Sequence, residues 1–170
     1  KLNAAFDKIL YDNMELDNMT GKVILKNGIA TLDNVKFGTI GGQFAMNGSY
    51  DPTDKAHPKF DFDLDIQKAN IGKAYATFNT IQQLAPIAKT MDGLFSTNFK
   101  IDGELDQEMM PNFSTVSGKG LINILEATAN TNLTILDKIA EVTKLDKLGS
   151  QSNSFTSMLL DAEIKNGRLF

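Results

Sequence analysis

Hydrophobic and polar residues alternate along much of this chain. The clearest stretch lies between Lys59 and Gln67, where apolar residues take turns with Asp61, Asp63 and Asp65. Because successive side chains of a strand point to opposite faces, this stretch predicts a strand with one apolar face and one acidic face. Such strands are typical of an antiparallel sheet that is covered on one side only.

The same period of two recurs elsewhere and is interrupted by residues that favour turns. Asn27-Gly28, between two β-prone runs, is the strongest short hairpin signal, and Asp102-Gly103 and Asn166-Gly167 are expected to end two further strands in the same way. The glycines of 38–42 predict a flexible break. Besides the strand at 59–67, we expect strands over 21–26, 29–37, 43–50, 94–101, 117–125 and 155–165.

Three segments instead repeat their apolar residues at the helical period of about 3.6. A short helix is expected over 3–11, a longer one over 71–90 and a third over 131–148. Asn70 is expected to cap the start of the second helix, because Asn accepts hydrogen bonds from free amide groups there. Pro86 is expected to kink or end the same helix.

These elements predict an α+β fold of one domain over 1–170. We expect a curved, mostly antiparallel β-sheet, a meander or groove, with two amphipathic helices packed on or capping its apolar face. A length of 170 residues is enough to bury a core. The chain begins at Lys1 without a methionine, so we expect it to be a fragment of a larger protein.

Composition removes several classes of function. The net charge of -4 and the absence of a run of Lys or Arg argue against a nucleic-acid partner. With no cysteine in the chain, thiol catalysis, disulfides and cysteine-based zinc sites are excluded. The sequence contains no apolar stretch of the roughly 18 to 20 residues that a membrane span needs, and no signal peptide.

Few residues suggest chemistry, and each fits a simpler interpretation. Asp61, Asp63 and Asp65 resemble the start of a calcium loop, but Ile66 stands where that loop requires glycine, so a solvated strand face is expected instead. His57 is the single histidine and lies in a predicted surface turn. The glycines of 118–120 lead into a strand rather than a helix, so they are expected to mark a bulge or turn and not a phosphate loop. We therefore predict no catalytic residue, no metal site and no cofactor.

The remaining candidate is the apolar face of the sheet. One interpretation is a closed core beneath the helices. The other is a face that stays partly open as a groove for acyl chains or another apolar partner, because such sites are concave, largely apolar and preformed. The candidate contact residues come from several strands: Phe44, Met46, Phe60, Phe62, Leu64, Ile66, Phe95 and Phe99.

The order of these segments resembles the carboxy-terminal region of AsmA-like proteins. In that family a glycine-led apolar strand, an Asn-Gly turn, a Gly-Gly strand ending in Tyr-Asp, helical insertions and a late strand closed by Asn-Gly follow one another. The matching segments here are 21–35, 41–51, 59–66, 118–121 and 155–167. The Asn- and Lys-rich composition is similar to that of the Bacteroidetes-type Gram-negative branch.

The resemblance implies a place and a role. AsmA-like proteins are large cell-envelope proteins, anchored in the inner membrane by an amino-terminal helix, with most of their mass in the periplasm. They are similar to bridge-like lipid carriers with repeating β-grooves, and they are implicated in phospholipid transport and outer-membrane assembly. The implied partners are phospholipid acyl chains and neighbouring segments of the same parent protein. Because the two helices depart from a bare trough, a structural or protein-interaction module with a closed core and no lipid remains the alternative.

Overall fold

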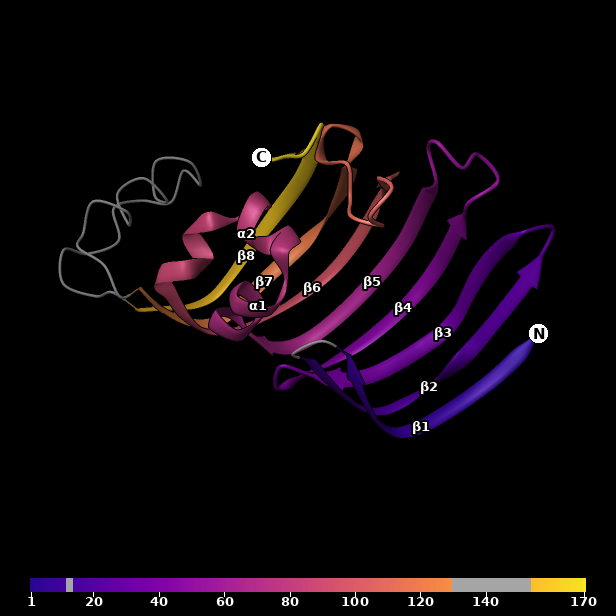
Figure 1. Ribbon diagram of the computed structural model, residues 1–170. Coiled ribbons are helices and arrows are strands. Elements are labelled where there is room, and N and C mark those ends of the chain that lie inside the picture. Colours follow the sequence, from indigo (N-terminus) through magenta and orange to yellow (C-terminus); the bar gives the residue numbers. More distant parts are fainter. Residues whose placement is uncertain (12–13, 130–153) are drawn as a thin grey trace.

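A computed structural model describes residues 1–11, 14–129 and 154–170 (Figure 1). These residues form one curved sheet in which every strand is antiparallel to its neighbours and the strand order follows the chain. The sheet is therefore an open meander. Its strands are β1 (Leu2–Tyr11), β2 (Met14–Lys26), β3 (Ile29–Thr39), β4 (Gly42–Asp51), β5 (Lys59–Asn70), β6 (Met91–Glu104), β7 (Ser117–Ala129), β8 (Ser154–Lys165) and β9 (Arg168–Leu169). The helix predicted over 131–148 lies outside the described residues.

Tight turns of left-handed backbone join several of these strands. Asn27 and Gly28 have φ angles of 53° and 82°, and Asn166 and Gly167 have φ angles of 49° and 69°. Two successive positive φ angles match the right-handed twist of a hairpin, and Asn-Gly adopts them at low cost. Both predicted hairpins are confirmed. The predicted break at 38–42 is a hairpin of the same kind, and β3 and β4 run up to it on either side.

Two local predictions are wrong. The segment 3–11 is not a helix but most of β1, which pairs with β2 along its whole length. A helix this short is marginal on its own, whereas the backbone of β2 offers a full ladder of hydrogen bonds. Asp102-Gly103 does not end a strand but lies inside β6. Gly103 stands directly opposite Phe60 on β5 and leaves room for its ring.

One face of the sheet is apolar from the first strand to the last, and we call it the inner face. It is traced by residues that stand directly opposite one another on successive strands: Leu2, Val23, Leu32, Gly48, Phe62, Ile101, Gly118, Ile164 and Leu169. The opposite, outer face carries most of the charged residues of the strands, such as Asp63 and Lys100. The predicted α+β class, with a curved antiparallel sheet that is apolar on one side, is confirmed.

A helical insertion between β5 and β6 lies over the inner face beside β6, β7 and β8 (Figure 1). It consists of α1 (Ile71–Thr77), α2 (Asn79–Leu84) and the 3₁₀ helix η1 (Pro86–Thr90). The helical prediction for 71–90 is thus confirmed, although the segment is broken into three pieces. The Asn70 side chain accepts a hydrogen bond of 2.8 Å from the amide of Lys73, as predicted for an N-cap.

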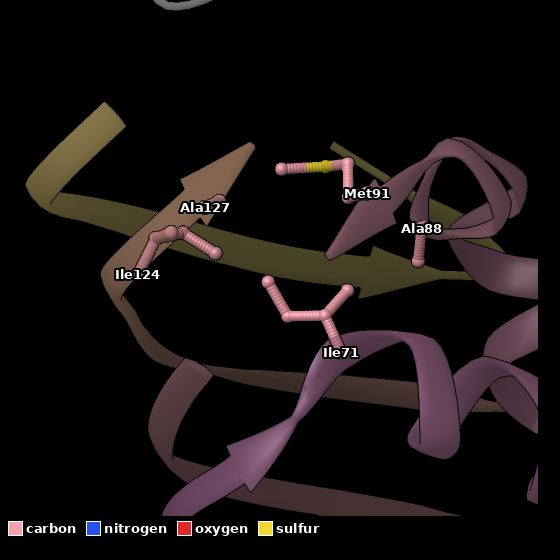
Figure 2. Close-up of a cluster of buried hydrophobic side chains, with 5 residues drawn as sticks. All are labelled: Ile71, Ala88, Met91, Ile124 and Ala127. Carbon is pink, nitrogen blue, oxygen red and sulfur yellow. The ribbon is translucent and has the colours of Figure 1, made fainter. Parts of the chain in front are cut away.

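The insertion and the strands beneath it enclose two apolar clusters. The first contains Ile71, Ala88, Met91, Ile124 and Ala127 (Figure 2). The second contains Phe60, Val116 and Ile164, and Leu84 of α2 packs against it. Both clusters belong to the part of the inner face formed by β5 to β8. The two clusters therefore lie toward the carboxyl-terminal strands of the sheet and not at its middle.

Candidate functional site

The inner face has two parts that differ in what lies over them. The covered half comprises the inner-face residues of β5 to β8, which pack against the insertion in the two clusters. The open half comprises those of β1 to β4. The insertion reaches the open half at Phe44, whose ring centroid lies 6.3 Å from that of Phe78 and 5.4 Å from that of Phe37 on β3. Beyond that contact, no helix among the described residues lies over β1 or β2.

The structure divides the eight predicted contact residues between these halves. Phe60 belongs to the second cluster, Phe62 and Phe99 pack against it, and Phe95 packs against the first. These four side chains therefore contribute to the core. Phe44 is buried, and the remaining three are half-buried at the border between the halves: Met46, Leu64 and Ile66. The interpretation as a closed core thus describes the covered half and the adjoining part of β3 and β4, where Val35 and Phe44 are 2% and 9% exposed.

The largest exposed apolar side chains of the open half were not among the predicted residues. Leu2, Phe6 and Leu25 are 64%, 51% and 68% exposed. Leu2 stands opposite Val23 on the inner face, Phe6 follows it at a spacing of four along β1, and Leu25 follows Val23 at a spacing of two along β2. The wrong helix over 3–11 concealed Phe6, and Leu2 lies directly before that range. Extending the alternation back to Leu2 would have revealed them.

Glycines shape the floor of the inner face. Three phenylalanines each stand directly opposite a glycine on the next strand: Phe60 opposite Gly103, Phe62 opposite Gly48 and Phe99 opposite Gly120. A Cβ atom on Gly48 would lie 2.4 Å from Cδ1 of Phe62, and one on Gly120 would lie 2.8 Å from Cδ2 of Phe99. The rings thus occupy the space that the glycines leave free. Gly120 forms neither the bulge nor the turn that its sequence predicted, but supports this close packing.

The outer face has the polar character that the aspartates predicted. Asp61 and Asp63 are exposed on it, and Lys100 on β6 lies 3.6 Å from Asp63. Asp65 accepts a hydrogen bond of 2.9 Å from Asn98. These carboxylates therefore face solvent and neighbouring polar groups along the strand, in agreement with the interpretation as a solvated face.

The single histidine lies in the exposed turn between β4 and β5, as predicted. Its Nδ1 atom is 3.3 Å from Oδ2 of Asp54. The amide of Ala56 donates to Asp54 and, together with His57, holds the pKa of that carboxyl below its usual value. These are interactions within one turn, and they stabilise its local conformation.

A hollow of about 420 Å³ lies where β5, β6 and β7 come together beside the insertion. Asn70 donates to Asp92 across it at 3.3 Å, and the amide of Gly93 donates to the same carboxylate at 2.9 Å. Because these polar groups bond to one another, the hollow offers few free groups to a ligand. The open half of the inner face is the stronger candidate.

The chain was compared with known proteins. No protein-family model, curated protein or solved structure matches it. Among the described residues, no helix has the length and apolar character needed to cross a bilayer. The candidate site therefore rests on the geometry of the inner face and on the order of the sequence segments.

Proposed function

We propose that this domain is a non-catalytic segment of an AsmA-like envelope protein, and that the open half of its inner face binds phospholipid acyl chains. One observation carries the proposal. Leu2, Phe6 and Leu25 are more than half exposed, and they lie on a face that continues directly into the apolar core. Large contiguous apolar patches are rare on soluble monomers and mark sites of interaction.

The dimensions of the open half suit an extended hydrocarbon chain. β1 contains 10 residues and β2 contains 13. At roughly 3.3 Å per residue such strands extend about 33 to 43 Å, which exceeds the length of one acyl chain in a bilayer about 30 Å thick. Each methylene that leaves water against this face would contribute about 0.8 kcal/mol.

The proposed contact residues are a revision of the predicted set. Met46 remains, with Leu64 and Ile66 at the border of the covered half, whereas Phe44 is left out because it is buried beside Phe78 of the insertion. Leu2, Phe6 and Leu25 join them because of their exposure. The phenylalanines of the two clusters are left out, because the insertion already occupies their apolar surface.

The cellular setting of the proposal comes from the sequence resemblance. We place the domain in the periplasm of a Gram-negative bacterium, within a parent protein anchored in the inner membrane. Its role there would be phospholipid transport or outer-membrane assembly, with no cofactor. Neighbouring segments of the parent protein would extend the apolar face.

Native mass spectrometry of the chain, purified gently from cells, tests the proposal. Wild-type protein is expected to retain phospholipid and to extract labelled phospholipid from vesicles of phosphatidylethanolamine and phosphatidylglycerol. The double variant Phe6→Asp, Leu25→Asp is expected to lose both properties. The matched control is Leu159→Asp, because Leu159 is 63% exposed on β8 but stands opposite Asn123, on the outer face. Circular dichroism verifies that each variant is folded.

A second candidate function is a structural or protein-interaction module. The two closed clusters favour it, because they stabilise the covered half without any ligand. Wild-type protein that is folded, free of lipid and inactive in extraction would contradict lipid binding and support this module. Equal loss of lipid in the double variant and in Leu159→Asp would also contradict a site on the inner face.

A further inference from the structure

The chain contains three Asn-Gly pairs, and the structure places them in different surroundings. Asn27-Gly28 forms the turn between β2 and β3, Asn166-Gly167 forms the turn between β8 and β9, and Asn47-Gly48 lies inside β4. Asparagine is chemically labile, and a following glycine makes it more so, because the missing Cβ atom leaves the next backbone amide free to approach the side chain. All three asparagines are exposed, so the exposure of the side chain does not distinguish the three sites.

Deamidation joins the side chain of an asparagine to the backbone of the residue after it. The amide nitrogen of the glycine loses its proton to base and attacks Cγ of the asparagine, a carbon–nitrogen bond forms, and ammonia leaves. Water then opens the succinimide ring at either of its carbonyl groups, which gives aspartate or isoaspartate. The reaction therefore requires a glycine amide that is not held by a hydrogen-bond acceptor, and a backbone that can rotate into the ring.

The turn at Asn27 meets both requirements. Asn27 and Gly28 are both exposed. In the part of the chain that the structure describes, the amide of Gly28 donates no hydrogen bond. A Cβ atom added to Gly28 would have its nearest described neighbour, Cγ2 of Thr53, 3.8 Å away. This turn therefore has a free nucleophile and space to rotate while the strands behind it stay paired.

The turn at Asn166 has the same backbone shape but is held in place. The amide of Gly167 donates a hydrogen bond of 3.0 Å to the carbonyl oxygen of Val116. A Cβ atom on Gly167 would lie 2.2 Å from the carbonyl oxygen of Phe113, so this turn is packed against the segment before β7. Ring closure at Asn166 therefore requires the hydrogen bond to break and the turn to move away.

The pair inside β4 is held most firmly of the three. β4 lies between β3 and β5, and Gly48 stands opposite Leu32 on one side and Phe62 on the other. The side-chain oxygen of Asn47 accepts a hydrogen bond of 2.7 Å from the amide of Asn34. Ring closure at Asn47 therefore requires β4 to separate from its neighbours.

We propose that Asn27 is a site of spontaneous deamidation, at which water converts the side-chain amide to aspartate or isoaspartate while Asn47 and Asn166 are retained. Isoaspartate adds a methylene group to the backbone, so the two-residue turn loses the geometry that pairs Lys26 with Ile29. Aspartate leaves the backbone unchanged and adds a negative charge. The modification changes the end of the β2–β3 hairpin, and it does not depend on what the open half binds.

Peptide mapping by mass spectrometry tests the proposal on the folded chain, incubated in mildly alkaline buffer and sampled over time. An isoaspartyl methyltransferase labels the isoaspartate that forms. Asn27 is expected to convert about tenfold faster than Asn166 or more, because one backbone hydrogen bond must first break at Asn166. Asn47 is expected to stay intact over the same period, because part of the sheet would have to open. The rate at Asn27 should rise with pH, because base removes the proton of the glycine amide.

The chain unfolded in guanidinium chloride is the control for the sequence itself, and there the three sites are expected to convert at similar rates. The matched variant is Asn27→Asp, which is expected to fold, by circular dichroism, and to show no further conversion in this turn. Equal rates at Asn27 and Asn166 in the folded chain overturn the proposal. So does an Asn27 that stays intact in the folded chain while it converts in the unfolded one. A gain in mass that persists in Asn27→Asp also overturns it, because it places the reaction at Asn34.

Discussion

The covered and open halves of the inner face arise from the same alternation of residues but have different physical roles. In the covered half, Phe60 is 7% exposed and packs with Val116 and Ile164 beneath the insertion. In the open half, Phe6 occupies an equivalent inner-face position and is 51% exposed. Alternation therefore determines which face a side chain joins. The insertion determines whether that side chain stabilises the fold or remains free to bind a partner.

Truncating one phenylalanine in each half is expected to give the largest difference in the free energy of unfolding. Phe60→Ala is expected to lower the free energy of unfolding by about 3 to 5 kcal/mol, because it removes a buried ring and leaves a cavity. Phe6→Ala is expected to change it by less than about 0.5 kcal/mol, because the side chain is already in water. Urea denaturation at low protein concentration measures both. Similar losses in the two variants would show that the open half is also covered.

The next largest loss of stability is expected when a methyl group is added to a glycine on the inner face of the covered half. In Gly120→Ala the new Cβ atom would lie 2.1 Å from the carbonyl oxygen of Asn98 and 2.7 Å from Cα of Phe99. β6 and β7 must separate, at a cost of about 1 to 3 kcal/mol. Gly72→Ala in α1 is the control, because its nearest neighbour atom is 3.5 Å away and alanine favours a helix. Thermal unfolding of both variants should move in opposite directions, and a tolerated Gly120→Ala would contradict the close packing.

Removing the contact between the insertion and the open half is expected to expose more of the inner face. In Phe78→Ala, the ring that lies 6.3 Å from that of Phe44 is lost. The expected loss in the free energy of unfolding is about 1 to 2 kcal/mol, because Phe78 is half-buried and contributes part of a full burial. Binding of a hydrophobic dye should increase as Phe44 becomes exposed. Thr77→Ala, next to it at an exposed position, should leave dye binding unchanged.

The smallest expected effect concerns the ion pair at the edge of the open half. The hydrogen bond and the charge of Lys8 hold the pKa of the Glu15 carboxyl below its usual value, and Glu15 raises the pKa of Lys8. Because the carboxyl is more acidic in the folded chain, its contribution is present at neutral pH and is lost as the pH falls through the lowered pKa. Both side chains are exposed, so the effect is small and screened by salt. Unfolding of wild type and Glu15→Gln across a pH series should converge in acid, and a gap that persists there would contradict this assignment.

Predictions from the sequence were correct where the deciding interactions lie within a few residues of one another. The alternation at 59–67 predicted the two faces of β5, Asn27-Gly28 predicted the first hairpin, and Asn70 predicted the helix cap. Each depends on bonds or side-chain directions within a few residues. Prediction failed at 3–11 and at Gly103, where the deciding interactions come from β2 and from Phe60 on another strand.

The candidate site shows the same division. The sequence alone established an antiparallel sheet with one apolar face, because the direction of each side chain follows from its position in a strand. Only the tertiary structure decided which part of that face is core and which part is exposed, because coverage depends on where the insertion after Asn70 folds back. It also decided that 3–11 belongs to a strand, since that depends on pairing with β2 and not on the residues of β1 alone.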